Sequence, residues 1–306
     1  MPDFAASGAP GQRLRRLMDD HCVLAPGAFN GLCARAIADA GFEAAYVSGA
    51  AISVCAGVPD VGLLTLDHFA RVVREVVDGT KPPGGAGPAL PVICDADTGF
   101  GEAEMVRRTV IEYARAGAAG LHLEDQQFPK RCGHLDGKAL VPLDHMVEKV
   151  QWAAAAARDA GGGFIICART DARGVEGLDA AIERASAYVR AGADMIFPEG
   201  LTSEGEFGAF AAQLREQAAR PIYLLANMTE FGKTPMLRAA QFGELGYDLV
   251  IYPVSALRAA MGAAQRMLAD LKRDGSVEAH LEQMQTRKEL YRLIGYQPGT
   301  PWKMNA

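Results

Sequence analysis

One cysteine, Cys132, lies among cationic residues in the stretch PKRCGHLDGK (129–138), a setting that favours thiol chemistry. The neighbouring lysine, arginine and His134 favour the thiolate and so lower the pKa of the thiol from its free value of about 8.5. Such a thiol exchanges protons readily, and it is equally suited to act as a nucleophile. Gly133 and Gly137 would let this polar stretch open and close like a lid. We therefore expect Cys132 and His134 to be catalytic; an idle surface cysteine is the alternative, although proteins usually avoid exposed reactive thiols.

Carboxylates gather at the ends of two neighbouring apolar runs. Asp95 and Asp97 end the run LPVICDADTG, and Glu124 ends the run GLHLEDQ. Residues two apart on an ideal strand point to the same side, so these acids are expected to converge, which is unfavourable unless a cation lies between them. Oxygen ligands without histidine or thiolate favour Mg²⁺ or Mn²⁺ over zinc. Neutralisation by Arg169 alone, from the next run, is the alternative.

Polar residues also end most of the other apolar runs. In barrel enzymes the active site forms at the C-terminal ends of the strands, so these residues are expected to share one site. The ordinary start of a polar loop explains one or two cases, but it does not readily explain clustered carboxylates that face an arginine. Besides the three carboxylates, the run ends carry Ser48, Gly49, Asp125, Arg169, Asp171, Glu199, Asn227 and Thr229.

Eight short aliphatic runs alternate with amphipathic, alanine-rich segments along the chain. The runs are mostly apolar on both faces, as buried parallel strands are. This repetition in 306 residues predicts an α/β fold, a (β/α)₈ TIM-type barrel over residues 1–275. A doubly wound open sheet is the alternative, but the first run is not followed by a GxGxxG turn. The runs lie at 21–29, 42–50, 90–99, 120–126, 164–172, 194–200, 221–228 and 248–254.

A further helical segment, EAHLEQMQTRKELYRLIGY (278–296), falls outside the eight units. We expect residues 276–306 to form a C-terminal extension that covers either its own barrel or that of a neighbour. Arg287 in this segment and Arg258 in YPVSALRAAM are candidate carboxylate clamps, because a guanidinium matches that anion in a bidentate way. A solvated helix position for Arg258 and an intrahelical ion pair for Arg287 are the alternatives.

The composition is typical of a globular protein, with 49% hydrophobic and 22% charged residues. A net charge of −6 argues against nucleic-acid binding. The sequence has no apolar run of about 18 residues that would indicate a membrane span, and its N-terminus lacks the apolar centre of a secretory signal. Six cysteines without a CxxC pair, of which Cys94 and Cys167 lie in apolar runs, favour reduced thiols. We therefore expect a cytoplasmic protein without nucleic-acid or membrane partners.

Seven motifs carry a family resemblance: DADTGFG (95–101), GLHLEDQ (120–126), KRCGH (130–134), CARTDA (167–172), EGLDAAIERA (176–185), FPEG (197–200) and NMTEFGKTP (227–235). Together they resemble the isocitrate lyase and phosphoenolpyruvate mutase superfamily, and within it the short bacterial 2-methylisocitrate lyases. The match covers almost the whole chain, from YVSGA (46–50) to MQTRKELY (284–291). KRCGH is the signature of the lyase branches, since mutase and hydrolase relatives generally carry other residues at the cysteine.

The resemblance implies a barrel that binds Mg²⁺, or Mn²⁺ in its place, and cleaves a carbon–carbon bond in a small tricarboxylate. The implied reaction converts 2-methylisocitrate to pyruvate and succinate in propionate breakdown. Isocitrate or 2,3-dimethylmalate cleavage and oxaloacetate decarboxylation are the sister activities, and a dicarboxylate-binding barrel without turnover is the non-enzyme alternative. Relatives form tetramers in which a C-terminal helix swaps onto a neighbour, so the resemblance implies a homotetramer in which residues 276–306 pack on a neighbouring subunit.

The resemblance also implies roles for individual residues. Asp95 and Asp97 would hold the metal, and Glu124 and Asp60 would hold metal-bound waters. Cys132 would give a proton to the aci-carboxylate that remains when pyruvate leaves, while Tyr46, a carboxylate and a metal-bound hydroxide are candidates for the base. The family often has glycine where this chain has alanine at position 50. The implied substrate contacts are Ser48, Gly49, Ala50, Cys132, Gly133, Arg169, Glu199, Asn227, Met228, Thr229, Arg258 and Arg287.

Overall fold

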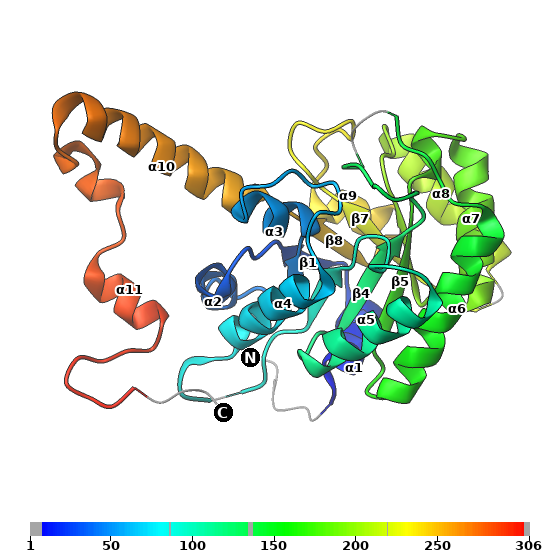
Figure 1. Cartoon of the computed structure of the whole chain (residues 1–306), viewed down its shortest axis with the longest axis horizontal. Helices are drawn as coiled ribbons and strands as arrows, with labels where there is room; N and C mark the ends of the chain where they lie inside the picture. Colours follow the sequence, from blue (N-terminus) through cyan, green and yellow to red (C-terminus); the bar gives the residue numbers. More distant parts are fainter. Residues whose placement is uncertain (1–7, 86, 134–136, 219, 303–306) are drawn as a thin grey trace.

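The computed structural model describes residues 8–85, 87–133, 137–218 and 220–302, and eight parallel strands form its centre (Figure 1). They pair in the order β1-β8-β7-β6-β5-β4-β3-β2. A parallel bridge between Gly27 and Tyr46 joins β1 to β2 and closes the ring, which confirms the predicted barrel. The strands are β1 (Val23–Pro26), β2 (Ala45–Val47), β3 (Val92–Asp95), β4 (Gly120–Glu124), β5 (Ile165–Thr170), β6 (Met195–Pro198), β7 (Tyr223–Asn227) and β8 (Leu249–Tyr252).

The N-terminal end of the barrel is covered by α1 (Pro10–Asp20). Leu14 and Met18 of this helix pack against the apolar side chains that fill the inside of the barrel. The helix lies so close that a Cβ atom on Gly11 would be 2.2 Å from the carbonyl oxygen of Gly163. Because α1 covers this end, we expect a ligand to enter from the C-terminal ends of the strands, where barrel enzymes have their active sites.

A second apolar core lies between the outer face of the sheet and the surrounding helices. Local signals fix their ends: the Asn30 side chain accepts a hydrogen bond from the Cys33 N–H at the start of α2, and Gly192, with φ 115°, ends α7 in the left-handed region. The helices around the barrel are α2 (Gly31–Asp39), α3 (Gly49–Cys55), α4 (Leu66–Thr80), α5 (Ala103–Arg115), α6 (Leu143–Ala160), α7 (Leu178–Ala191), α8 (Glu204–Gln217) and α9 (Ala239–Glu244), with 3₁₀ turns η1 (Pro83–Gly85) and η2 (Ala172–Gly174).

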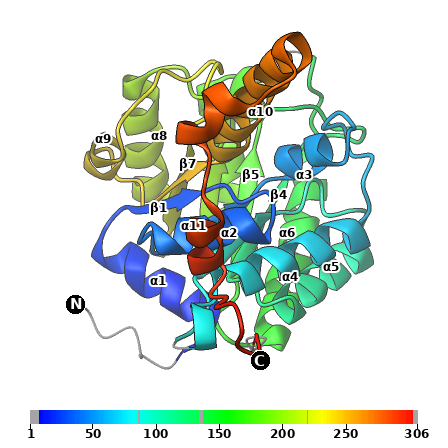
Figure 2. The same cartoon turned by 90° about the vertical axis from the view of Figure 1, so that its left-hand side faces the viewer.

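The C-terminal helices leave the barrel. The long helix α10 (Ser255–Asp274) projects away from it (Figure 1), and η3 (Glu278–Gln283) follows. The chain then returns, so that α11 (Arg287–Leu293) lies beside α2, where Arg292 pairs with Asp39 at 3.0 Å (Figure 2). Packing of residues 276–306 on a neighbouring subunit therefore stays a prediction for the assembled protein. None of the helices in the described ranges is long and apolar enough to cross a membrane.

All eight predicted strands are present, and each is shorter than its apolar run. The expectation that a single strand would direct Asp95 and Asp97 to the same side is wrong. The strand β3 ends at Asp95, and Asp97 lies in a tight turn with φ 46°, in the left-handed region that aspartate tolerates better than most residues. The turn still keeps the two residues together, because the Asp97 N–H donates to Asp95 Oδ1 at 3.0 Å.

Candidate active site

The C-terminal ends of the strands enclose a small cavity of about 100 Å³. Pockets for small molecules usually measure roughly 300–1,000 Å³, so this one is nearly filled. The chain segment that follows β4 lies across it and contributes four consecutive residues of its lining, 130–133. Most of the predicted site residues meet here: Tyr46, Ser48, Ala50, Asp60, Asp95, Cys132, Gly133, Arg169, Glu199, Asn227, Thr229 and Arg258.

Asp95 is held in one orientation at the end of β3. Its Oδ2 accepts a hydrogen bond from the Gly49 N–H and its Oδ1 accepts one from the Asp97 N–H, both at 3.0 Å. The Tyr113 hydroxyl donates to its backbone carbonyl at 2.8 Å. A Cβ atom on Gly49 would lie 2.8 Å from Asp95 Oδ2, so this close approach requires glycine. The Gly49 N–H, predicted to meet substrate, here orients a carboxylate.

A buried lysine, Lys130, lies among the predicted metal-binding carboxylates. Its Nζ is 2.8 Å from Asp97 Oδ1 and also pairs with Asp60. Burial acts to lower the pKa of Lys130, but the carboxylates around it, Glu124 foremost, raise that pKa far above its ordinary value. Burial raises the pKa of Asp97 to about 7 in spite of the lysine. The cluster also contains Asp95, so it has more carboxyl groups than the single ammonium group can neutralise.

The same cluster fits a divalent cation. Glu124 Oε1 is buried without a hydrogen-bond donor, and burial raises the pKa of this carboxyl well above its ordinary value. All of the candidate donors are carboxylate oxygens, which Mg²⁺ and Mn²⁺ prefer. Within the described ranges, no three acidic, histidine or cysteine side chains lie close enough to form a full ligand set. Mg²⁺ needs only one or two carboxylates, because waters and substrate complete its shell.

Arg169 extends from β5 into the centre of the acids. Its Nε lies 2.9 Å from Asp171 Oδ2 and 3.2 Å from Glu124 Oε2, and its NH1 lies 3.5 Å from Glu199 Oε2. The guanidinium also lies 5.1 Å from the centre of the Phe197 ring. Burial acts to lower the pKa of Arg169, but these carboxylates raise it well above its usual value. The arginine is therefore a fixed, permanently charged group at the edge of the cavity.

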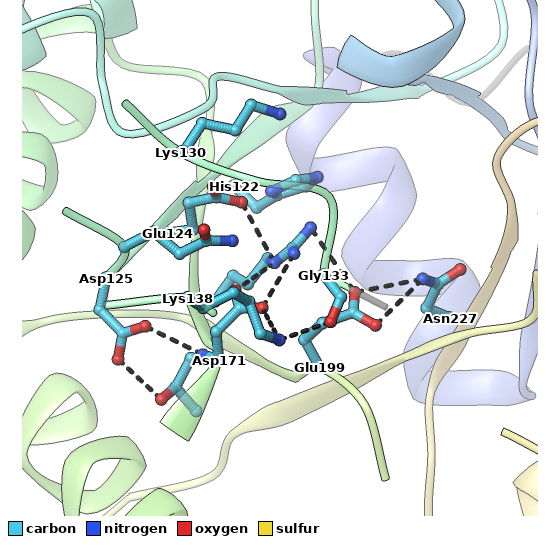
Figure 3. Close-up of polar contacts among 12 residues, drawn as sticks. His122, Glu124, Asp125, Lys130, Gly133, Lys138, Asp171, Glu199 and Asn227 are labelled. Carbon is cyan, nitrogen blue, oxygen red and sulfur yellow. Dashed lines mark hydrogen bonds and ion pairs between the residues drawn. The ribbon is translucent and has the colours of Figure 1, made fainter. Parts of the chain in front are cut away.

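The part of the cavity wall that lies across from the predicted metal-binding carboxylates is also polar, and it extends to the rim of the cavity. Asn227 donates from Nδ2 to Glu199 Oε2 at 3.2 Å (Figure 3). At the rim, Arg258 is partly exposed, and its NH1 donates to the Glu230 carbonyl at 2.6 Å while the guanidinium lies over the Phe231 ring. A guanidinium at the mouth of the cavity is well placed to meet an entering carboxylate.

The segment after β4 brings the predicted thiol to the cavity. Cys132 is half-buried and lines it, and the backbone at Gly133 lies directly on the opposite wall. A Cβ atom on Gly133 would be 2.4 Å from Arg169 NH2 and 2.5 Å from Glu199 Cγ. Only glycine allows this approach, so the glycine of the motif KRCGH has a steric reason here.

Five described residues of the predicted set are not among those that line the cavity: Gly49, Asp97, Glu124, Met228 and Arg287. The Met228 side chain is buried in the outer core, where its sulfur accepts a hydrogen bond from the Leu237 N–H at 3.3 Å. Arg287 begins α11 and is not among the residues that line the cavity. His134 lies outside the described residues. The roles assigned to Met228, Arg287 and His134 stay predictions.

Two groups that belong to the site were not predicted from the sequence. His122 accepts or donates at Nε2 to the Tyr46 hydroxyl at 2.7 Å, and Lys138 pairs with Asp171. His122 could have been found, because it stands two residues before Glu124 on the same strand and so faces the same interior. Lys138 follows the glycine-rich segment, and nothing in its spacing indicates that its partner is Asp171, the residue after β5. It lies buried beside Gly133 (Figure 3).

A barrel with acids, an arginine and a thiol at its strand ends defines a barrel enzyme that acts on an anionic small molecule. The model of the family described as phosphoenolpyruvate phosphomutase matches residues 14–272, and the chain belongs to this family. It is therefore a member of a catalytic superfamily, and the predicted resemblance to the isocitrate lyase and phosphoenolpyruvate mutase superfamily is confirmed.

Individual relatives place the chain within this family. The probable 2-methylisocitrate lyase 1 of Corynebacterium glutamicum is 52% identical over 90% of this chain and 86% of its own length. The 2-methylisocitrate lyase of Aeropyrum pernix is 48% identical over 94% and 88%. Among solved structures, 2,3-dimethylmalate lyase has a TM-score of 0.85 at 35% identity, covering 94% of this chain and 92% of its own. Phosphonopyruvate hydrolase with oxalate and Mg²⁺ has a TM-score of 0.80 at 30% identity, covering 94% and 95%.

Proposed function

We propose that this protein is a Mg²⁺-dependent lyase that cleaves 2-methylisocitrate to pyruvate and succinate in propionate breakdown. The observation that carries the proposal is the juxtaposition, over one cavity, of the Cys132 segment, Arg169 and the carboxylates that end β3 and β4. The relatives named 2-methylisocitrate lyase support the choice of substrate. The thiols held by all six cysteines fit a cytoplasmic enzyme, since disulfides mark oxidising compartments.

The residues of this chain account for binding and proton transfer in such a reaction. Asp95 and Asp97 would hold the cation, with Glu124 and Asp60 nearby, and the cation when bound supplies Lewis acidity to the oxygens of the departing pyruvate. The guanidinium groups of Arg169 and Arg258 bind substrate carboxylates.

Cleavage of the C2–C3 bond leaves an aci-carboxylate on the succinate side, which requires cationic stabilisation and a proton. Cys132 donates this proton from its thiol. Burial raises the pKa of Tyr46 well above its ordinary value, so the phenol keeps its proton at neutral pH, and it is hydrogen-bonded to His122. This state disfavours Tyr46 as the base that removes the C2 hydroxyl proton.

Identification of the products tests the proposal. The purified protein is incubated with Mg²⁺ and, separately, with 2-methylisocitrate, isocitrate, 2,3-dimethylmalate and oxaloacetate, and proton NMR follows the products with and without EDTA. We expect pyruvate and succinate from 2-methylisocitrate, at the highest kcat/KM of the four, and no turnover in EDTA. Faster cleavage of another acid would reassign the substrate, and binding without turnover of any acid would indicate a non-catalytic barrel.

We further infer that the enzyme is a homotetramer in which the C-terminal extension packs on a neighbouring subunit. The projecting helix α10 carries an apolar stripe at helical spacing, formed by Leu257, Met261, Leu268 and Leu271. Met261 and Leu268 are 49% and 54% exposed in the single chain, which is unusual for residues aligned on one helix face. A second copy of the chain would cover this stripe.

Charges on this stripe are expected to break the assembly. Met261→Glu with Leu268→Glu places carboxylates where the neighbour would bury apolar side chains, and a buried unpaired charge is strongly unfavourable. By light scattering after gel filtration, the parent protein should have about four times the chain mass of 32.5 kDa and the double variant a smaller mass. Arg266→Glu, on the opposite side of α10, is the matched control. A tetramer that survives the double change would exclude α10 from the interface.

A further inference from the structure

One buried cation in the site, Lys138, has no part in the reaction described above. Its side chain is 5% exposed, and its Nζ lies 2.7 Å from Asp171 Oδ1. The same ammonium donates a hydrogen bond to the carbonyl oxygen of Gly133 (Figure 3). A buried lysine is unfavourable unless it is paired and hydrogen-bonded, so these two partners determine where the ammonium lies.

These two partners come from parts of the site with different functions. Gly133 follows Cys132 directly on the segment that covers the cavity. Asp171 belongs to the barrel and is the carboxylate that receives Arg169, with contacts of 2.9 and 3.2 Å. Although burial acts to raise the pKa of Asp171, the positive charges of Arg169 and Lys138 bring it to about 2, so this carboxylate is ionised at any working pH.

The base of the segment is fixed independently of Lys138. Gln126 accepts from the Arg131 N–H at 2.9 Å through its side-chain oxygen and donates from Nε2 to the Arg131 carbonyl at 2.8 Å. An antiparallel bridge joins Gln126 to Leu140, and the Gln127 N–H donates to the Ala139 carbonyl. The two ends of the segment are therefore anchored side by side, whereas its tip, which carries the thiol, lies beyond these anchoring contacts.

We propose that Lys138 is a positioning residue that latches the Cys132–Gly133 tip onto Asp171, and so holds the thiol in register with Arg169. The kinetic consequence of this latch rests on the proposed function, whereas the closed position of the segment does not. Lys130 also tethers the tip, but it ends on Asp60 and Asp97, which are predicted to serve the metal. The acceptors of Lys138, in contrast, lie outside that cluster.

The accessibility of the thiol tests the latch without any assumption about substrate. Iodoacetamide alkylation of Cys132 is followed by peptide mass spectrometry in the intact protein and in Lys138→Met, which keeps the length of the side chain and removes its charge. We expect the tip to open and Cys132 to be alkylated roughly ten-fold faster or more, because lid segments expose their site when they lose a closing contact. Lys81→Met, which removes a remote surface partner of Asp78, is the matched control and should leave the rate unchanged.

Steady-state kinetics on 2-methylisocitrate separate positioning from binding. A donor displaced by about 1 Å costs on the order of 10²-fold in rate, so Lys138→Met should lower kcat by about that factor while KM changes little. Lys138→Arg keeps a charge that reaches both acceptors, and it should recover most of kcat and slow the alkylation again.

The outcomes are distinct. An alkylation rate of Cys132 that stays within about two-fold of the parent in Lys138→Met overturns the latch, whatever happens to kcat. Faster alkylation in a protein that does not act on 2-methylisocitrate supports the latch and rejects the proposed function instead. If Lys138→Met does not fold, Lys138→Gln carries the same measurements, because its shorter, neutral side chain offers no charge to Asp171 and cannot span from Asp171 to the Gly133 carbonyl as the ammonium does.

Discussion

Cys132→Ser is expected to lower kcat for pyruvate release by about 10³-fold, within the range of roughly 10²–10⁴ that general acid–base catalysis contributes. The thiol is the acid in the proposed reaction, and a hydroxyl gives up its proton far less readily. Because Arg169, Glu199 and Asn227 still line the cavity, substrate binding should persist and KM should change little. A coupled assay of pyruvate with lactate dehydrogenase measures both constants.

The matched control for this change is Cys55→Ser. Cys55 is an exposed thiol at the end of α3, close in sequence to the site but not among the residues that line the cavity. Its replacement should leave kcat unaltered. If Cys132→Ser keeps clearly more than about a hundredth of the parent kcat, which is the smallest effect expected from a general acid, the thiol is not the proton donor. The lining groups that hold substrate could then still be correct, while the acid would have to be another group.

The barrel was predictable because each strand is marked by composition and each helix by periodicity. The run PVICD is apolar on both faces, and β3 is buried over its whole length. The particular bridge that closes the ring, between Gly27 and Tyr46, was not predicted, because it lies at the end of two short strands and no sequence pattern marks it. The cap formed by α1 was not predicted either, because Pro10–Asp20 precedes the first apolar run and lies outside the strand–helix repeat.

The site residues that end strands could be predicted, because the C-terminal ends of the barrel strands lie at the same rim for any loop sequence. Asp95, Arg169 and Glu199 are examples, and all three line the cavity. Side chains one residue further along face the other way, as the pleat requires. Asp125, next to Glu124, therefore points outward and accepts hydrogen bonds from the Thr170 and Tyr188 hydroxyls.

The partners of the two lysines that tether the thiol segment could not be predicted from the sequence. Both belong to a segment without strand or helix period, so no pattern indicates which acids they meet. From the sequence, Lys130 would be expected to be a solvated loop residue, yet in the structure it is 3% exposed and paired with two carboxylates. Lys138 would also be expected to be solvated, but its side chain is buried against Asp171. Such pairs are fixed only when the segment folds over the barrel, and they depend on long-range geometry.

Asp95→Asn is expected to lower kcat/KM by about 10³-fold or more, because a bound cation contributes several kcal/mol to transition-state charge stabilisation and about 4 kcal/mol corresponds to that factor. Asparagine keeps the size of the side chain, and its oxygen can still accept from the Gly49 N–H, so the fold should survive. It removes one negative charge from the cluster that would hold the cation. Titration of the protein with Mn²⁺ in a calorimeter should show weaker binding in parallel with the loss of activity.

Asp194→Asn is the control that separates a metal ligand from a structural acid. Asp194 also accepts a backbone hydrogen bond, from the Ile166 N–H at 3.0 Å, and pairs with Arg15 at 3.1 Å, but it lies near α1 at the opposite end of the barrel. Its replacement should lower stability and leave Mn²⁺ affinity unchanged. If Asp95→Asn binds Mn²⁺ as the parent does, and the parent is active in EDTA, then the acids are neutralised by Lys130 and Arg169 alone. Without a bound cation, stabilisation of the developing charge would fall to the cationic side chains of the site, of which Lys130 and Arg169 lie nearest the acids.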